Sequence, residues 1–381
     1  MSQAVKGKHV FPSLNNNSAD VQQNARKAKK RIEWVDIGKG LGIVFVSFVH
    51  IRNGQCQSVW LPSLNTTING FELFIMPIFY LLGGFTFSMR GGFKAFFIRK
   101  VRTLLVPYYF FSIYFLIKPV ALLLDPRLTH TFKTQQGFYG RKNEILYQIY
   151  NVLINGNGLW YFAAFFVAEI IAYGLVKLCK STVSKAVTGT VIVLATYAWS
   201  AFQLPQNLPF RAFDGIMISG YLLIGITLRS FFKNLHRPTA GIISVPTLLA
   251  VVICESLIAF DIVGNHASPF SHIVLDIVAA FGGGIGCICL AIFIARSKWL
   301  AAVGRNSLVY YALNAIALNI TKLLLFHILK INAIHAAYWI QLFIGIVMVA
   351  ISLVLLALAN IIVQRWFWWS IGKTNPRHPK H

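Results

Sequence analysis

The chain has 381 residues, of which 56% are hydrophobic and 12% are charged, with 35 Lys and Arg against 11 Asp and Glu. An average soluble domain carries about 25% charged residues, so this chain has too few to cover a water-soluble globule of its size. The composition argues against a soluble enzyme, a disordered protein or a disulfide scaffold, and it predicts an all-α, polytopic membrane protein.

The net charge of +24 does not indicate nucleic acid as a partner. The basic residues lie mostly between apolar runs, where they orient membrane helices. The five cysteines show no spacing typical of a zinc site or a disulfide framework, so we expect no metal and mostly buried, apolar cysteines.

The chain divides into a predicted membrane domain between two tails. Residues 1–30 are polar and basic without an apolar period, which predicts a disordered cytoplasmic tail, and residues 366–381 form a second one. The domain between them covers residues 31–365. Its apolar runs predict ten spans, at 36–53, 71–89, 103–124, 159–179, 187–204, 213–231, 240–260, 272–295, 306–327 and 338–364.

The distribution of basic residues predicts the orientation of these spans. With the amino terminus inside, the inside segments hold 25 Lys and Arg, against about seven outside. This favours two cytoplasmic termini and an even number of spans. The one long outside segment, 125–158, is either a functional loop or a connector with a short surface helix.

The first span, RIEWVDIGKGLGIVFVSFVH, carries ionisable groups that are costly inside a membrane. Lys39 and His50 are eleven residues apart, which places them within about 20° on one helix face and roughly 16 Å apart along the axis. Ser47 lies one turn before His50 on that face. A neutral imidazole here is a candidate general base, or else a histidine satisfied by a neighbouring helix or the interface.

The second span, FELFIMPIFYLLGGF, contains Pro77, which predicts a kink or a break. Gly83 and Gly84 predict close packing or room for a substrate. Glu72 is placed at the outer end, where it is either an ion-pair partner of Arg52 or part of a site.

Two arginines precede the third span. Arg99 and Arg102 are three residues apart on a predicted helix at the inner surface. Two guanidinium groups at this spacing suit phosphate or pyrophosphate, and they equally suit lipid headgroups.

Three further residues stand out in later spans. Trp160, in GLWYFAAFF, opens the fourth span and is either a belt aromatic or a platform for a sugar ring. Glu169 lies mid-span and requires a partner or a watery cavity. Asn314, in VGRNSLVYYALN, is a polar group within the ninth span that can join helices.

Taken in order, these segments resemble the acyltransferase-3 family of bacterial membrane acyltransferases. The resemblance rests on five short motifs between about residue 31 and about residue 320: DIGKGLGIVFVSFVH, FIMPIFYLLGGF, IRKVRTLLVPYYF, GLWYFAAFF and VGRNSLVYYALN. The chain departs from the family's pattern at Gly83, where relatives often carry a hydroxyl, and at Asn314, where many carry a histidine.

The resemblance implies an O-acyltransferase, most simply an O-acetyltransferase, that uses acetyl-CoA or another acyl-CoA as co-substrate. It implies about ten membrane helices in a bacterial inner membrane and an acceptor that is a carbohydrate or glycolipid of the cell envelope, such as a polysaccharide. Matched to the family's motifs, His50 is the catalytic residue, and Arg99, Arg102 and Lys39 face the acyl-CoA. Trp160, Glu72, Glu169 and Asn314 are candidate acceptor-binding residues. A transporter or flippase for a lipid-linked saccharide is the alternative, because ten spans with intramembrane charges suit it as well.

Overall fold

The computed structural model of the protein describes residues 32–52, 58–117, 120, 124, 141–259 and 269–373. The predicted tail at 1–30, Cys56 and residues 125–140 of the long segment lie outside this range. The chain divides into two compact units, residues 1–33 and 34–381, and every side chain of the candidate site belongs to the second.

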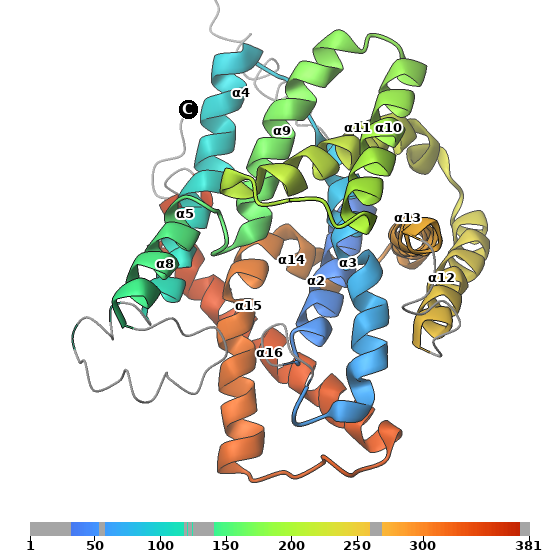
Figure 1. The fold of residues 1–381 in the computed structure, drawn as a ribbon. Coiled ribbons are helices and arrows are strands. Elements are labelled where there is room, and N and C mark those ends of the chain that lie inside the picture. Colours follow the sequence, from blue (N-terminus) through green and yellow to red (C-terminus); the bar gives the residue numbers. More distant parts are fainter. Residues whose placement is uncertain are drawn as a thin grey trace, which may run out of the picture. The chain divides into compact units, whose positions relative to one another are not determined.

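The described chain is helical, and no strand occurs among the described residues, so the all-α class is confirmed. Its first part contains α2 (Glu33–Val49), α3 (Asn65–Thr86), α4 (Gly92–Lys100), α5 (Val106–Ser112), α8 (Arg141–Leu153) and α9 (Trp160–Leu178). Its second part contains α10 (Thr182–Ala201), α11 (Ala212–Asn234), α12 (Arg237–Ala259), α13 (Pro269–Ile294), α14 (Lys298–Arg305), α15 (Ser307–Lys322) and α16 (Tyr338–Trp366) (Figure 1).

Seven segments of the described chain are long and apolar enough to cross a membrane. Each overlaps one of the predicted spans, and together they confirm a multi-pass membrane protein. The seven are Pro62–Thr86, Trp160–Leu178, Pro209–Asn234, Arg237–Ile258, Ile273–Ile294, Ser307–Ile328 and Tyr338–Trp366.

The other three predicted spans take different forms, so ten spans stay a prediction. α2 has 17 residues, most of them buried by other helices. α10 has 20 residues, with polar Thr, Ser and Lys side chains in its first turns. The third predicted span is a run of short helical pieces that begins before residue 103: α4, a π turn at Val101–Leu105, α5, and a 3-10 turn at Ile113–Leu116.

Pro107 gives a physical reason for the interrupted third span. Proline has no backbone N–H, and its ring clashes with the carbonyl four residues earlier. The π turn at Val101–Leu105 lies directly before it and widens the helix there. By contrast, Pro77 does not break α3, which continues as one helix from Asn65 to Thr86. Of the predicted kink or break, the structure therefore excludes the break, and a proline inside a membrane helix is tolerated where neighbouring helices compensate for the missing hydrogen bond.

Two glycines allow the helices around the site to approach closely. A Cβ at Gly84 of α3 would lie 2.8 Å from the Cα of Gly225 of α11, which is closer than any side chain permits. A Cβ at Gly40 of α2 would lie 2.9 Å from the carbonyl carbon of Leu300 of α14. These contacts confirm the predicted close packing and bring α2 and α3 into the interior.

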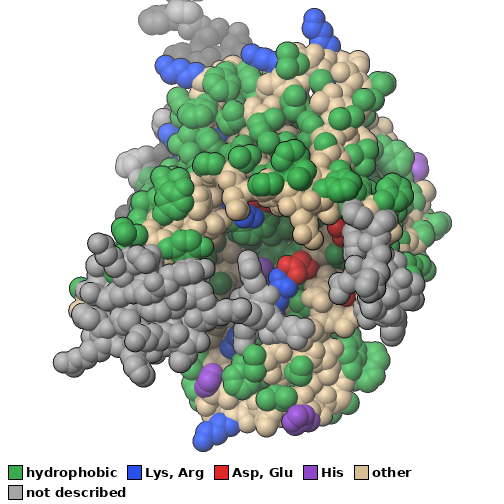
Figure 2. Space-filling view, in the orientation of Figure 1, with side chains coloured by type: hydrophobic (Ala, Val, Ile, Leu, Met, Phe, Trp, Pro, Cys, Tyr) green, Lys and Arg blue, Asp and Glu red, His purple; other side chains and the backbone are tan. Residues whose placement is uncertain are grey.

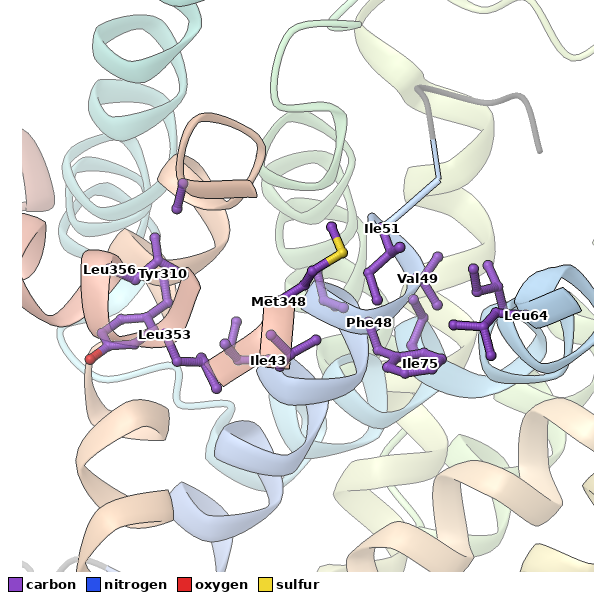
Figure 3. Close-up of a cluster of buried hydrophobic side chains, with 14 of the residues drawn as sticks. Ile43, Phe48, Val49, Ile51, Leu64, Ile75, Tyr310, Met348, Leu353 and Leu356 are labelled. Atoms are coloured by element: carbon purple, nitrogen blue, oxygen red, sulfur yellow. The ribbon is translucent and has the colours of Figure 1, made fainter. Parts of the chain in front are cut away.

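A buried apolar cluster fixes the carboxyl end of α2. Ile43, Phe48 and Val49 of α2 pack with Ile75 of α3 and with Met348 of α16 (Figure 3). The cluster therefore anchors the backbone that leads to His50, the residue after α2.

The four described cysteines are buried and unpaired, which confirms the prediction for them: Cys179, Cys254, Cys287 and Cys289.

Candidate functional site

A cavity of about 210 Å³, here called the central cavity, is lined by residues of all five sequence motifs. The motifs are far apart in the chain, yet α2, α3, the α4–α5 segment, α9 and α15 each contribute to its wall. The lining residues are Lys39, Met76, Phe79, Gly83, Thr86, Lys100, Leu104, Tyr161, Phe162, Phe165, Glu169, Ser307, Leu308 and Tyr311.

The central cavity is elongated and differs in polarity between its ends. Its lining on α3 runs from Met76 to Thr86, which corresponds to roughly 15 Å at the α-helical rise. α2 and α3 run antiparallel, because Gly38 meets Leu82 and Gly42 meets Phe79. The charged end of the cavity therefore lies beside Lys39. The aromatic end lies farther along α2 in the direction of His50, which does not itself line the cavity.

An ion pair lies at the charged end of the cavity. Lys100 Nζ lies 2.6 Å from Glu169 Oε1, with the Glu169 side chain 3% exposed and the Lys100 side chain 18% exposed. Glu169 Oε2 is buried and has no hydrogen-bond partner in the structure. Glu169 thus has both the partner and the cavity that its mid-span position requires. Sequence reasoning missed Lys100, because the requirement of Glu169 for a partner does not select Lys100 over the neighbouring Arg99 and Arg102.

The two arginines do not line the central cavity. Arg99 and Arg102 are exposed and line a surface groove of about 470 Å³ together with Thr103 and Gly372. Lys100 and Leu104, from the same helical segment, face the central cavity instead. Arg99 donates hydrogen bonds to the carbonyl oxygens of Ser88 and Arg90, at 3.2 Å and 3.4 Å, which hold its guanidinium group against the loop before α4.

His50 follows the last residue of α2 and keeps an exposed side chain. Its Nδ1 lies 2.8 Å from the carbonyl oxygen of Val46. A carbonyl oxygen can only accept, so Nδ1 carries the proton and donates it to this bond. In the neutral ring Nε2 is then the proton acceptor, which is the form that a general base requires.

Charged groups surround the carboxyl end of α2. Arg52 and Glu72 form a two-bond ion pair, with Arg52 Nη1 2.6 Å from Glu72 Oε2, which is one of the two alternatives that the sequence left open for Glu72. Lys322, the last residue of α15, donates to the carbonyl oxygens of Arg52 and His50 at 2.8 Å and 3.3 Å. Lys322 was not identified from the sequence. It joins α15 to the backbone that carries His50.

A buried polar pair connects α2 to α15 between the central cavity and His50. Asn314 Nδ2 donates to Ser47 Oγ at 2.7 Å, and Ser47 Oγ donates to the carbonyl oxygen of Ile43 at 3.0 Å. Asn314 lies one turn from Tyr311, which lines the cavity, and Ser47 lies one turn from His50. Asn314 Oδ1 is buried without a partner in the structure. It is thus an acceptor for a hydroxyl or amide group that reaches this level.

Trp160 lies outside the central cavity. It is the first residue of α9, and the guanidinium group of Arg211 lies 5.2 Å from its ring centre. Arg211 also pairs with Asp214 at 2.8 Å. The next residue, Tyr161, lines the cavity and packs against Phe79 and Tyr311.

A hollow on one face of the molecule contains basic, acidic and histidine side chains among apolar ones (Figure 2). Of the residues singled out from the sequence, Lys39 and Glu169 meet in the central cavity. His50 and Glu72 lie near the carboxyl end of α2, while Arg99 and Arg102 occupy their own groove. No group of three or more His, Cys, Asp or Glu among the described residues is arranged to hold a metal ion.

Comparison with known proteins identifies the family. The model of the acyltransferase domain of the acyltransferase-3 family matches residues 32–358. The chain therefore belongs to this family, and its membrane domain is an acyltransferase domain. No curated protein and no solved structure is similar enough to count as a match.

Proposed function

We propose that this acyltransferase-3 family member moves an acyl group, acetyl in the simplest case, from acyl-CoA to a hydroxyl group of a cell-envelope carbohydrate. The proposal includes a bacterial inner-membrane location, ten spans and two cytoplasmic termini. The observation that carries it is the convergence of all five motif segments on one elongated cavity. That cavity has a cationic end at Lys39 and points along α2 toward a histidine with a free acceptor nitrogen.

The cationic side chains near the cytoplasmic side of the proposed topology are suited to binding the phosphate groups of acyl-CoA. Arg99 and Arg102 share an exposed groove, and their guanidinium groups can form paired bonds with phosphate oxygens. Lys39 lines the charged end of the central cavity on the cytoplasmic side of the proposed topology. A pantetheine arm lying along the cavity would carry the thioester toward His50, over the roughly 16 Å that separate it from Lys39.

The proposed reaction is a direct transfer. His50 Nε2 accepts the proton of an acceptor hydroxyl, and the hydroxyl oxygen attacks the carbonyl carbon of the thioester. The carbon–sulfur bond then breaks, the proton passes to the sulfur, and the products are an ester and CoA. The bond from Nδ1 to the Val46 carbonyl stabilises the charged imidazole that forms during this step.

The acceptor is expected at the carboxyl end of α2. Asn314 Oδ1, which accepts no hydrogen bond from the part of the chain that the structure describes, lies near this level and suits a sugar hydroxyl. Glu72 and Trp160 remain candidate acceptor contacts, although Arg52 and Arg211 already engage them. Glu169 faces the donor end of the cavity, so we place it with Lys39 rather than with the acceptor.

The test uses inverted membrane vesicles that contain the protein and acetyl-CoA labelled on the acetyl group. We expect label in a lipid or polysaccharide fraction with the wild type and its loss with His50→Asn. Asparagine can still donate to the Val46 carbonyl but has no nitrogen in place of Nε2. The matched control is His335→Asn, because His335 is an exposed histidine of the segment between α15 and α16.

The possible results differ clearly. Labelling that survives in His335→Asn and is lost in His50→Asn, at equal protein levels, supports the transferase. Equal labelling in all three proteins would remove His50 from the mechanism. No labelling in any of them, with acceptor shown to be present, would favour the transporter for a lipid-linked saccharide.

A further inference from the structure

A second cavity, of about 450 Å³, lies between α3, α12 and the first residue of α16. It is separate from the candidate site, since Gly70 of α3 faces it while Glu72, two residues on, pairs with Arg52. Two residues correspond to roughly 200° around a helix, so the Glu72 side chain leaves α3 on nearly the opposite side from the face that Gly70 presents to the cavity. Nothing in the proposed acyl transfer uses this cavity.

The lining of this second cavity changes from polar to apolar with depth. Thr66 and Thr67 lie in the first turn of α3, and Tyr338 is the first residue of α16. Thr67 Oγ1 and the Tyr338 hydroxyl are hydrogen-bonded at 2.9 Å. Phe74 of α3 and Leu248 of α12 line the cavity farther from the helix ends. Over roughly 12 Å of helix the cavity thus has the polarity profile of a membrane lipid, with its polar part at the level of helix ends.

A carboxylate lies at the polar end of the cavity. Glu255 is near the last turn of α12, and its Cγ would be 3.3 Å from a Cβ at Gly70, so glycine leaves it room. Among the residues that the structure describes, Glu255 has no ion pair and no side-chain hydrogen bond. A carboxylate in a membrane-spanning helix is costly without a donor or a cation nearby.

The cavity opens toward the lipid. Val252 lines it and is 60% exposed, and beyond the first turn of α12 the other large exposed aliphatic side chains are Ile242, Val245, Leu249 and Ile253. α12 packs mainly along α13 and only lightly against α3, which leaves the gap between α12 and α3. In Figure 1, α12 and α13 lie together beside α3. An occupant can therefore enter from the bilayer.

We propose that this cavity binds a phospholipid whose headgroup carries a primary ammonium, such as phosphatidylethanolamine. The ammonium donates to Glu255 and to the hydroxyl oxygens of Thr66 and Tyr338, while one acyl chain lies on Phe74 and Leu248. An anionic headgroup is disfavoured beside the carboxylate. A quaternary ammonium has no N–H to donate, so it binds more weakly. This local preference is opposite to that of the basic segments elsewhere, which attract anionic lipids.

The first test needs no variant. The purified full chain in detergent is titrated with phosphatidylethanolamine and with its mono-, di- and trimethylated forms of equal chain length, and bound lipid is counted by native mass spectrometry. We expect affinity to fall at each methylation, because each removes one N–H donor. For the trimethylated form, which has no N–H, affinity should be at least about tenfold lower, since the loss of even one charge-assisted hydrogen bond corresponds to about that factor. Equal affinity across the series, or a preference for phosphatidylglycerol, would overturn the proposal.

Variants of the cavity lining then test whether the lipid binds in this cavity. Glu255→Gln should remove the headgroup preference, and Gly70→Leu should block binding by filling the space beside Glu255. Glu33→Gln, which changes an exposed acid at the start of α2, should bind as the wild type does. Thermal unfolding without lipid checks that each variant is folded. If a variant does not fold, the methylation series on the wild type alone tests the headgroup preference. Retained preference in folded Glu255→Gln would locate the lipid elsewhere and contradict the proposal.

Discussion

The buried ion pair between Lys100 and Glu169 gives the sharpest prediction for stability. Replacing Lys100 by Met leaves the buried Glu169 carboxylate, which is 3% exposed, without its ion-pair partner. Breaking a buried pair in this way typically costs about 3–5 kcal/mol. Glu169→Met should cost less, because the Lys100 side chain is 18% exposed and its ammonium group can turn toward water.

The double variant separates the pair from simple packing. Replacing both members by Met removes both charges, so we expect its free energy of unfolding to lie within about 1–2 kcal/mol of the wild type. The assay is denaturant unfolding in detergent micelles of the wild type, both single variants and the double variant. Lys94→Met, an exposed lysine of the same helix α4, is the control and should have little effect. Additive costs of the two single changes in the double variant would refute the reasoning.

Three further predictions follow from individual contacts. Gly84→Ala should destabilise the protein by about 1–3 kcal/mol, because the new methyl group meets the backbone of α11, whereas Gly174→Ala, with nothing within 4 Å, should not; thermal unfolding compares them. Ser47→Ala should cost about 1–3 kcal/mol in denaturant unfolding, since it leaves its buried amide partner without an acceptor, and a cost near zero would mean that the 2.7 Å bond is not formed. Arg102→Ala should raise the KM for acyl-CoA about tenfold, with a smaller effect at high salt, while the exposed Lys180→Ala leaves it unchanged; equal KM values would remove Arg102 from donor binding.

The sequence predicted the features that depend on composition and local pattern. Seven of the predicted spans agree with helices of the structure. Such spans can be recognised from one property of the sequence, an apolar run long enough to cross the hydrocarbon core of a bilayer. The ion pair of Arg52 with Glu72 was one of two alternatives for Glu72, since both residues lie at adjoining ends of consecutive helices.

Other features depend on tertiary packing and were not accessible from one sequence. The first predicted span carries ionisable groups that are costly inside a membrane, and the structure shows the corresponding helix, α2, largely buried by other helices. The pairing of Lys100 with Glu169 joins residues 69 positions apart, and no local pattern selects Lys100 over its arginine neighbours. The π turn before Pro107 further alters which side chains face inward, so helical spacing alone did not separate the cavity side from the groove side.

In the proposed reaction the two ends of α2 have different roles, because the acyl donor is bound at Lys39 and the proton is transferred at His50. Steady-state acetyl transfer by the purified protein, measured as kcat and as KM for acetyl-CoA, tests it most directly. We expect His50→Asn to lower kcat by at least about a hundredfold with little change in KM, since general-base catalysis contributes that much. Lys39→Met should raise KM about tenfold with a smaller effect on kcat. A normal kcat in His50→Asn, or a raised KM in that variant with none in Lys39→Met, would contradict the assignment of the two ends.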